Sequence, residues 1–193
     1  MKIAIIGKGN VGTALANGLE SAGHEIKFGH KDPSEPVVDA AKWGEVVILA
    51  VPFSAVKDVA KQIAPTVDGK VVVDVTNVLG SNWELAIGFT TSGAEELQKL
   101  LPKAHVVKAF NTVFAGNMNT GKLSTGQLSA FIAGDNADAK EIVMKLAKDI
   151  GFEPVDTGPL NSARYLEPMA VLLIGLGYGQ KMGSYIGFKL LKE

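Results

Sequence analysis

The stretch KIAIIGKGNVG at residues 2–12 decides how this chain is expected to fold. Ile3–Ile6 is a short, continuous apolar run, which is typical of a strand that is covered on both faces. The hexapeptide GKGNVG follows it directly and has the spacing G-x-G-x-x-G. Apolar residues then recur at helical intervals from Val11 to Leu19, and Gly23 follows as a C-terminal stop. The sequence therefore predicts a strand, a glycine-rich turn and a helix in immediate succession.

The order of these elements indicates what the glycine-rich turn does. Glycines at such a junction allow a tight turn and a close approach of the backbone to a pyrophosphate, and the amides and dipole of the following helix face that anion. Because the chain holds 22 glycines, the motif alone is a weak signal, and its place between strand and helix carries the prediction. A glycine turn without a ligand is the alternative. We expect a dinucleotide-binding site.

The rest of the chain repeats the alternation of strand and helix. A second strand is expected at Glu25–Gly29, and further β-branched runs lie at Val46–Ala50, Val71–Val75, His105–Ala109 and Ala130–Ala133, with a weaker one near Pro154–Asp156. Between them, Ser92 and Glu95 form a capping-box pattern that predicts the start of a helix. Such alternation predicts an α/β fold of the Rossmann type, with a doubly wound parallel sheet.

One connection is too short for the full Rossmann pattern. Only a brief span with Pro33 and Pro36 separates the second strand from the strand that begins at Val46. A helix, a strand and another helix do not fit into that span. We therefore expect one short helix around Val37–Trp43 and a sheet that lacks the third strand at this edge.

The composition changes after Asp156. A loop there leads into an apolar, helical stretch around 163–176 and then into a tail rich in glycine and aromatic residues. We therefore divide the chain into a dinucleotide-binding Rossmann domain, residues 1–156, and a short, mostly helical C-terminal segment, residues 157–193.

Charge and composition exclude several classes of protein. The net charge is −1, whereas nucleic-acid binding needs a basic face that replaces phosphate counterions. The chain has no cysteine, which excludes disulfides and thiolate metal sites, and its sequence shows no metal-ligand pattern, so no metal site is expected. The longest uncharged apolar run, Pro168–Gly179, is shorter than the ~18–20 residues that span a bilayer, and the N-terminus lacks a signal-peptide pattern. We expect a cytoplasmic protein that binds neither nucleic acid nor membrane.

Residues 27–32, KFGHKD, lie where an NAD-binding fold keeps a carboxylate for the adenosine ribose. His30 and Lys31 stand there instead and offer two potential cations to a 2′-phosphate, and Gly29 is expected to leave room for it. A charge-assisted hydrogen bond contributes about 1.5–3 kcal/mol, so NADP(H) should be preferred roughly ten- to a hundredfold. Two alternatives stay open: Asp32 is the acid of an NAD site, or the stretch is only a solvated turn.

Several longer motifs carry a family resemblance. They are GKGNVG at 7–12, GHK at 29–31, AVPFSAV at 50–56, DVTN at 74–77, SGAEELQKLLP at 92–102, VKAFNTVFAGNM at 107–118 and DTGPLNSARYLE at 156–167. With them the chain resembles the NADP-dependent coenzyme F420 oxidoreductases and the N-terminal oxidoreductase domain of the STEAP metalloreductases, over nearly its whole length. It departs from these relatives in two places. They typically have Gly-Ser-Arg where this chain has Gly-His-Lys, and the shortened third-strand region exposes one flank of the adenosine pocket.

The resemblance implies which residues bind the cofactor NADP(H). The glycine-rich turn would hold the pyrophosphate, the end of the second strand the 2′-phosphate, and the ends of later strands the adenosine, ribose and nicotinamide. The implied cofactor-binding residues are Gly7, Lys8, Gly9, Asn10, Val11, Gly12, His30, Lys31, Val51, Pro52, Phe53, Asn77, Ala109, Asn111 and Thr112. The structural alternative is that Pro52 only ends a strand and that Asn77 and Asn111 only satisfy their own turns.

The second substrate is expected to be a small-molecule electron acceptor with a flavin-type ring. Reducing a carbonyl or imine needs a proton donor beside the hydride donor, and only Tyr165 and Lys108 remain as candidates, with nothing in their spacing to select them. Hydride transfer to a flavin-type ring needs close stacking and the exclusion of water. This demand fits the F420 or flavin acceptor that the resemblance implies.

The acceptor site would lie between the sheet edge and residues 157–193, which complete it. Phe114, Met118 and Met169 are expected to line it, with a plain core role as the alternative. No side chain is assigned to chemistry beyond positioning, for which Asn111 is the candidate.

We thus expect an NADP(H)-dependent oxidoreductase that transfers hydride between the nicotinamide and F420 or a flavin. Two alternatives remain: an imine or carbonyl reductase that uses NADPH, and a sensor protein that binds NADP(H) without turnover. The apolar C-terminal stretch and the tail sequence YIGFKLL are either core of the domain or a surface for a second copy. A homodimer is expected, because short proteins of the families that the chain resembles often pair in this way.

Overall fold

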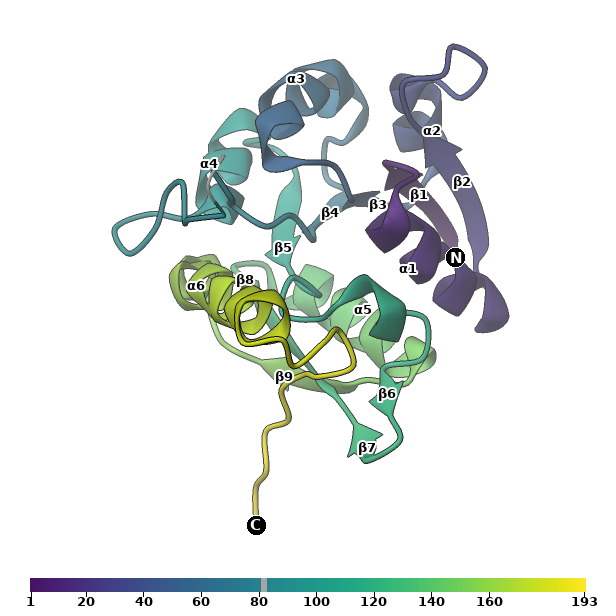
Figure 1. The fold of residues 1–193 in the computed structure, drawn as a ribbon. Helices are drawn as coiled ribbons and strands as arrows, with labels where there is room; N and C mark the ends of the chain where they lie inside the picture. The colour runs from purple at the N-terminus through teal and green to yellow at the C-terminus, as the bar shows by residue number, and fades with distance from the viewer. Residues whose placement is uncertain (81–82) are drawn as a thin grey trace.

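The structure of the chain, a computed structural model, describes residues 1–80 and 83–193. Its centre is a seven-stranded sheet with helices on both faces (Figure 1). The strands lie in the order β2-β1-β3-β4-β5-β8-β9, and their bounds are Lys2–Ile6 for β1, Glu25–Gly29 for β2, Val46–Leu49 for β3, Val71–Asp74 for β4, His105–Lys108 for β5, Ser129–Gly134 for β8 and Glu153–Asp156 for β9. Strands β1 to β5 pair in parallel. The predicted Rossmann-type fold is confirmed.

The missing third strand is confirmed as well. Within the described residues, β2 is the edge strand, because the connection from β2 to β3 holds only the short helix α2, Val37–Trp43. Strand β1 lies between β2 and β3 and pairs with both. Ile3 lies opposite Ile26 of β2 on one side and opposite Val46 of β3 on the other. Helix α2 consequently packs directly over the end of β2.

Strand β8 runs antiparallel to β5, where a parallel strand was expected, with Val107 opposite Gly134. A parallel neighbour needs a crossover connection, usually a helix, and the residues between β5 and β8 form short turns and a hairpin instead. These elements are η2 at Ala115–Asn117, β6 at Lys122–Leu123 and β7 at Gly126–Gln127. Helix α5, Ala137–Ile150, then provides a crossover, and β9 pairs with β8 in parallel.

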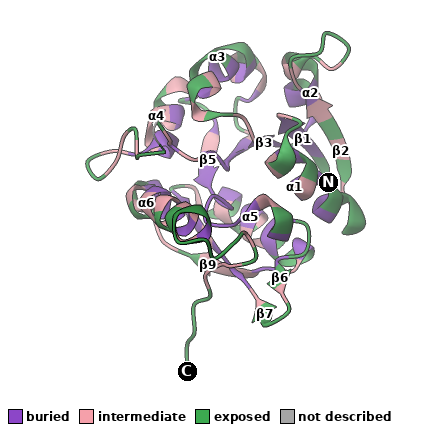
Figure 2. Cartoon of the chain, viewed as in Figure 1, coloured by how far each residue is buried: buried purple, intermediate pink, exposed green. Residues whose placement is uncertain are grey.

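Two apolar layers enclose the sheet. Ile3 and Ile5 of β1 pack with α1 and α5 on one face. Ala4 and Ile6 point to the other face and pack with α2, α3 and α4. Helix α1 spans Asn10–Ser21, α3 spans Phe53–Ile63 and α4 spans Gly93–Leu100. Figure 2 shows buried residues along the strands and on the inner sides of the helices, as a doubly wound sheet requires.

Helix α4 begins where the capping-box pattern predicted. Ser92 Oγ accepts a hydrogen bond from the Glu95 backbone N–H at 3.2 Å and donates one to Glu95 Oε2 at 2.8 Å. The backbone N–H of Glu95 and the hydroxyl of Ser92 thereby both have a hydrogen-bond partner at the start of the helix.

The C-terminal residues form one more helix and a tail. A 3-10 turn, η3 at Leu160–Ser162, leads into α6, Ala163–Ile174, which packs against α4 and continues as a π-helical turn, η4 at Gly175–Gly179. The tail then passes β8, where the Ser129 N–H donates to the Phe188 carbonyl at 2.9 Å, and its last residues project away from the body (Figure 1). In the described ranges, no helix is both long and apolar enough to cross a membrane.

Candidate functional site

Two cavities lie at the carboxyl ends of the parallel strands, where doubly wound sheets bind their ligands, and a third lies beside α6. The β2 cavity, about 740 Å³, lies between the glycine-rich loop, the end of β2, and helices α2 and α3. The central cavity, about 560 Å³, lies between the same loop and the ends of β3 and β4. The α6 cavity, about 640 Å³, lies between Trp83 and the junction of α6 with η4. Gly9 borders the first two, and Trp83 borders the last two.

The glycine-rich loop is tightly packed at Gly7 and Gly12, whereas the space beside Gly9 is open. A Cβ atom at Gly7, where φ is 110°, would lie 2.2 Å from the Ala50 carbonyl oxygen, and one at Gly12 would lie 2.1 Å from the Gly7 carbonyl oxygen. At Gly9 such an atom would have no described atom within 4 Å. The loop therefore keeps a free space at Gly9, facing the cavities.

This free space has the properties that a pyrophosphate needs. Gly9 is the N-cap residue of α1, so the first amides of a twelve-residue helix lie beside the space without a covering side chain. The positive end of the helix dipole points the same way. The predicted loop residues are brought together as expected, and they fit a dinucleotide.

The end of β2 brings His30, Lys31 and Asp32 to the wall of the β2 cavity. Gly29 has a different role from the one expected. A Cβ atom there would lie 2.9 Å from Ala40 Cβ and 2.9 Å from Val37 Cα. The prediction that Gly29 leaves room for a phosphate is therefore wrong, because α2 already fills that room.

The residue missed at this cavity is Glu35. Its carboxylate accepts hydrogen bonds from Lys8 Nζ at 3.0 and 3.1 Å and lies 2.5 Å from His30 Nε2. The hydrogen bond from Lys8 is the largest cause that holds the pKa of Glu35 below its ordinary value. Lys8 and His30, which both line the β2 cavity, thus share the carboxylate of Glu35. The signal in the sequence was an acidic residue between Pro33 and Pro36, which gives no hint of its partners.

Asp32 acts as a turn residue in this structure. Its Oδ1 accepts hydrogen bonds from the Ser34 backbone N–H at 2.9 Å and from Ser34 Oγ at 2.8 Å. The backbone bond from Ser34 is the first cause that lowers the pKa of Asp32. Such a closed turn is typical of an aspartate at the start of a loop.

The central cavity collects the expected residues that follow β3 and β4. Val51, Pro52, Phe53 and Asn77 line it together with Val11. Asn77 Oδ1 is buried and has no hydrogen-bond partner among the described residues. An acceptor in this state is costly unless a donor reaches it, so a ligand amide would find a partner at this wall.

Ala109, Asn111 and Thr112 lie one layer deeper than expected. All three are buried, and none of them borders the three cavities formed by the described residues. Asn111 Nδ2 donates to the Leu166 carbonyl of α6 at 2.8 Å, whereas Asn111 Oδ1 and Thr112 Oγ1 lack partners among the described residues. Phe110, between them, has φ 62°, a strained conformation for a bulky residue that often marks functional sites.

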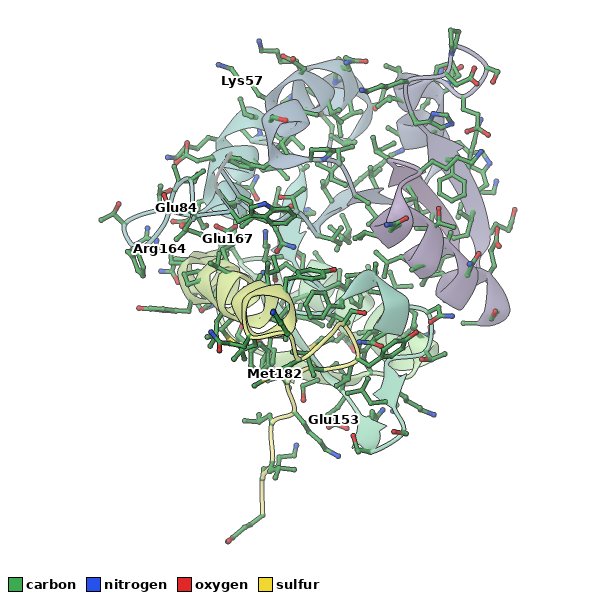
Figure 3. The ribbon with its side chains drawn as sticks, viewed as in Figure 1. Lys57, Glu84, Glu153, Arg164, Glu167 and Met182 are labelled. Atoms are coloured by element: carbon green, nitrogen blue, oxygen red, sulfur yellow. The ribbon has the colours of Figure 1, made fainter. Side chains whose placement is uncertain are left out.

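A buried charge cluster lies directly behind the central cavity. Lys108 Nζ contacts Asp74 Oδ2 at 2.9 Å, Glu167 Oε1 at 3.0 Å and the Thr76 carbonyl at 2.7 Å, and Thr76 lines the cavity. Burial lowers the pKa of Lys108, but the two carboxylates outweigh this effect and hold the pKa above its ordinary value. Lys108 is fully buried, so it stands out of reach of a substrate in these cavities. Sequence reasoning missed Glu167, which Figure 3 shows between α4 and α6.

The α6 cavity has apolar and aromatic walls. Its lining residues are Trp83, Val171, Ile174, Gly175, Tyr178 and Gly179. None of the three expected lining residues borders it: Met118 packs in the sheet core, Met169 is half-buried on α6, and the ring of Phe114 supports Tyr178 edge-on at 5.5 Å between centroids. Their apolar character correctly predicted that these three side chains are buried or half-buried, but not that they lie outside the lining of this cavity.

Comparison with known proteins identifies the family. A profile of the family described as NADP oxidoreductase, coenzyme F420-dependent, matches residues 2–38 and 32–78. The F420-dependent NADP reductase of Methanothermobacter marburgensis is 31% identical, and the match covers 91% of this chain and 92% of that protein. The chain belongs to this family of NADP-dependent oxidoreductases.

Two further proteins extend the similarity. A crystal structure of a protein from Arthrobacter sp. FB24, described as a candidate F420-dependent NADP reductase, superimposes with a TM-score of 0.93 at 29% identity and covers 100% of both chains. Metalloreductase STEAP3 of Rattus norvegicus is 31% identical over 90% of this chain. The chain spans just over a third, 37%, of the length of that metalloreductase. The predicted resemblance to both groups is confirmed.

Proposed function

We propose that this protein transfers hydride between NADP(H) and a small-molecule acceptor with a flavin-type ring, either F420 or a flavin. The observation that carries the proposal is Trp83, whose side chain borders both the central cavity and the α6 cavity. A nicotinamide in the first and an apolar ring in the second would be neighbours. NADPH, when bound, supplies the hydride from its nicotinamide ring.

The residues of the chain bind and orient the cofactor in this proposal. The loop from Gly7 to Gly12 holds the pyrophosphate at the start of α1, with Gly9 as the point of closest approach. Lys31 and His30 lie at the 2′-phosphate end, in the β2 cavity. The buried acceptor Asn77 Oδ1 offers a partner to the amide of the nicotinamide.

The deeper residues support this arrangement from behind. Asn111 and Thr112 belong to the segment that follows β5. The hydrogen bond from Asn111 to the Leu166 carbonyl joins this segment to α6. Ala109 adds a small buried side chain at the same point. These residues position the cavity wall rather than contact the reacting atoms.

The acceptor would stack in the α6 cavity. Its walls come from α6 and η4, and so residues 157–193 complete the acceptor site in this proposal, while residues 1–156 bind the dinucleotide. Apolar walls exclude water and favour a flat ring, and hydride transfer needs little beyond that geometry. Of the two proton donors that a carbonyl or imine reductase would require, Lys108 is fully buried and Tyr165 is 71% exposed on α6. Neither residue borders the β2, central or α6 cavity, which favours the flavin-type acceptor.

The test pairs binding with turnover in two glycine variants. Gly9→Ala places a methyl group into the space proposed for the pyrophosphate. Gly116→Ala is the matched control, because a Cβ atom at either position would have no described atom within 4 Å. NADPH binding is measured by fluorescence, and F420 or FMN is then added while NADPH oxidation is followed by absorbance.

Gly9→Ala is expected to weaken NADPH binding about tenfold or more, which corresponds to at least 1.4 kcal/mol, and Gly116→Ala is expected to bind as the unchanged protein does. Oxidation of bound NADPH by either acceptor supports the proposed reaction. Tight NADPH binding without oxidation by F420 or FMN contradicts the acceptor and favours the sensor. Equal binding by both variants contradicts the site itself.

A further inference from the structure

The loop after β2 is folded back on itself. The His30 backbone N–H donates to the Glu35 carbonyl at 2.9 Å, and the Glu35 N–H donates to the Asp32 carbonyl at 3.0 Å. Asp32 Oδ1 closes the same turn through Ser34. Because the backbone of Glu35 is bonded to that of His30, the Glu35 side chain is held beside the imidazole rather than free in solvent.

The side chain of Glu35 joins two groups that come from different elements. Lys8 belongs to the glycine-rich loop, and His30 follows the last residue of β2; both line the β2 cavity. The Glu35 carboxylate receives Lys8 Nζ at 3.0 and 3.1 Å and stands 2.5 Å from His30 Nε2. The side chains of the three residues keep 46%, 27% and 34% of their exposure, for Lys8, His30 and Glu35 respectively. The contacts are therefore accessible to a competing anion.

The three side chains leave little free positive charge at this position. The ammonium of Lys8 is neutralised by the carboxylate that it binds, and a second anion would have to take the same donors. A phosphate needs those donors more than a ribose does, because it brings about two negative charges to the site. A ribose hydroxyl, in contrast, is itself a donor, and a carboxylate is the partner that it prefers.

We propose that Glu35 is the residue that sets the choice between NADPH and NADH, because its carboxylate occupies donors of Lys8 and His30 on the wall where a 2′-phosphate would bind, and leaves Lys31 as the other cation of that wall. This inference rests on the proposed function. A 2′-phosphate has to displace Glu35 from both side chains, whereas a ribose without a phosphate binds without displacing it. The chain therefore discriminates between the two cofactors less than it would if the side chains of Lys8 and His30 were free of Glu35.

The test uses fragments that occupy only the adenosine end of the site. The affinities of adenosine 2′,5′-bisphosphate and of AMP are measured by calorimetry for the unchanged protein and for Glu35→Gln, which keeps the shape of the side chain and removes its charge. Glu20→Gln, an exposed position on α1, is the control for a change in net charge. Thermal melting of both variants checks that they are folded, and NADPH and NADH are titrated as a second pair.

In Glu35→Gln the ratio of bisphosphate affinity to AMP affinity is expected to rise about tenfold, the change expected from one charge-assisted contact, and in Glu20→Gln it is expected to stay within about twofold. An unchanged ratio in a folded Glu35→Gln overturns the inference. A ratio that falls also overturns it, because Glu35 would then hold Lys8 and His30 in place for the phosphate. If neither fragment nor either dinucleotide binds the unchanged protein, the proposed cofactor site fails, and the inference fails with it.

Discussion

The ammonium group of Lys108 is surrounded by acceptors from β4 and α6 and has no contact with solvent. A buried pair of opposite charges contributes little net stability, because desolvation offsets much of the attraction. Removal of one partner is different, since it leaves the remaining charge buried and unpaired. At the scale of a single residue, the cluster around Lys108 is therefore the point where the chain tolerates substitution least.

Lys108→Met is expected to lower the free energy of unfolding by about 3–5 kcal/mol. The variant leaves the carboxylates of Asp74 and Glu167 buried without their common cation. Lys145→Met is the matched control, because Lys145 pairs with Asp149 on the exposed side of α5, and such a pair contributes about 0.5 kcal/mol or less. Urea denaturation of the two variants compares them. A loss of less than about 1 kcal/mol in Lys108→Met would mean that the cluster relaxes or takes up a proton.

At the scale of elements, the contacts of α6 explain how the C-terminal segment is attached to the sheet. Glu167 accepts hydrogen bonds from the Gly93 and Ala94 amides at the start of α4, at 2.9 and 3.2 Å. Arg164, one turn earlier, forms two bonds to Glu95, at 2.9 and 2.6 Å. The carboxylate at the helix start is also favoured by the dipole of α4. Helix α6 is thus joined to α4 by charge as well as by apolar packing.

Helix α2 and strand β2 are joined by the close approach at Gly29. Gly29→Ala is expected to lower the free energy of unfolding by about 1–3 kcal/mol, because the new methyl group would meet Ala40 and Val37 and push α2 outward. Gly116→Ala adds the same atom where nothing is close and is expected to change stability little. Chemical denaturation measures both. If Gly29→Ala kept full stability and lost only NADPH binding, the original interpretation of Gly29 as a space for the ligand would be restored.

The elements that were predicted correctly are those with local signals. The first strand, the glycine-rich loop and the first helix, the bounds of α2, and the start of α4 at Ser92 each depend on residues that are neighbours in the sequence. The antiparallel course of β8 was not predictable in this way, because it follows from the absence of a helical pattern in the connection rather than from the strand itself. Contacts over long separations were missed for the same reason. Glu35 meets Lys8 from 27 positions away, and Glu167 meets Gly93 from 74.

In the candidate site too, the features with local sequence signals were predicted and those that depend on contacts between distant residues were not. The loop residues from Gly7 to Val11, the residues at the end of β3 and Asn77 line cavities, since the ends of parallel strands meet at one edge, whereas Gly12 is buried. The depth of Asn111 and Thr112 depends on the φ value of Phe110 and on the position of α6. No local sequence pattern predicts the φ value of Phe110 or the position of α6. The sequence-based prediction therefore located Asn111 and Thr112 at the correct edge of the sheet but too close to the surface.

At the scale of the whole molecule, large apolar side chains remain exposed in the C-terminal part. Leu172, Tyr178, Tyr185 and Leu191 are 56%, 63%, 77% and 80% exposed. Exposed apolar surface of this kind is typical of interfaces between protein chains. We therefore propose a homodimer in which α6 and the tail contact a second copy.

Leu172→Lys is expected to convert the dimer into a monomer, because the new charge would be buried against the second copy. Leu172 does not border the α6 cavity of the described residues, so NADPH binding should be kept. Phe89→Lys is the control, as Phe89 is also a large exposed apolar residue, at 73%, but lies outside the C-terminal segment. Light scattering coupled to size-exclusion chromatography gives the mass. A monomeric unchanged protein would contradict the proposed dimer.

Glu167 comes after β4, α4 and β5 in the sequence, and this order has a consequence for protein synthesis. The ribosome releases β4, α4 and β5 before α6, and during this interval Lys108 has only one of its two carboxylates and α4 begins without the side chain that later receives its first amides. The nascent sheet can collapse around its apolar residues, but its charged centre is completed only when α6 has left the exit tunnel. The charge cluster is therefore complete only after α6 has been synthesised, and in a chain truncated before α6 Lys108 would lack the carboxylate of Glu167.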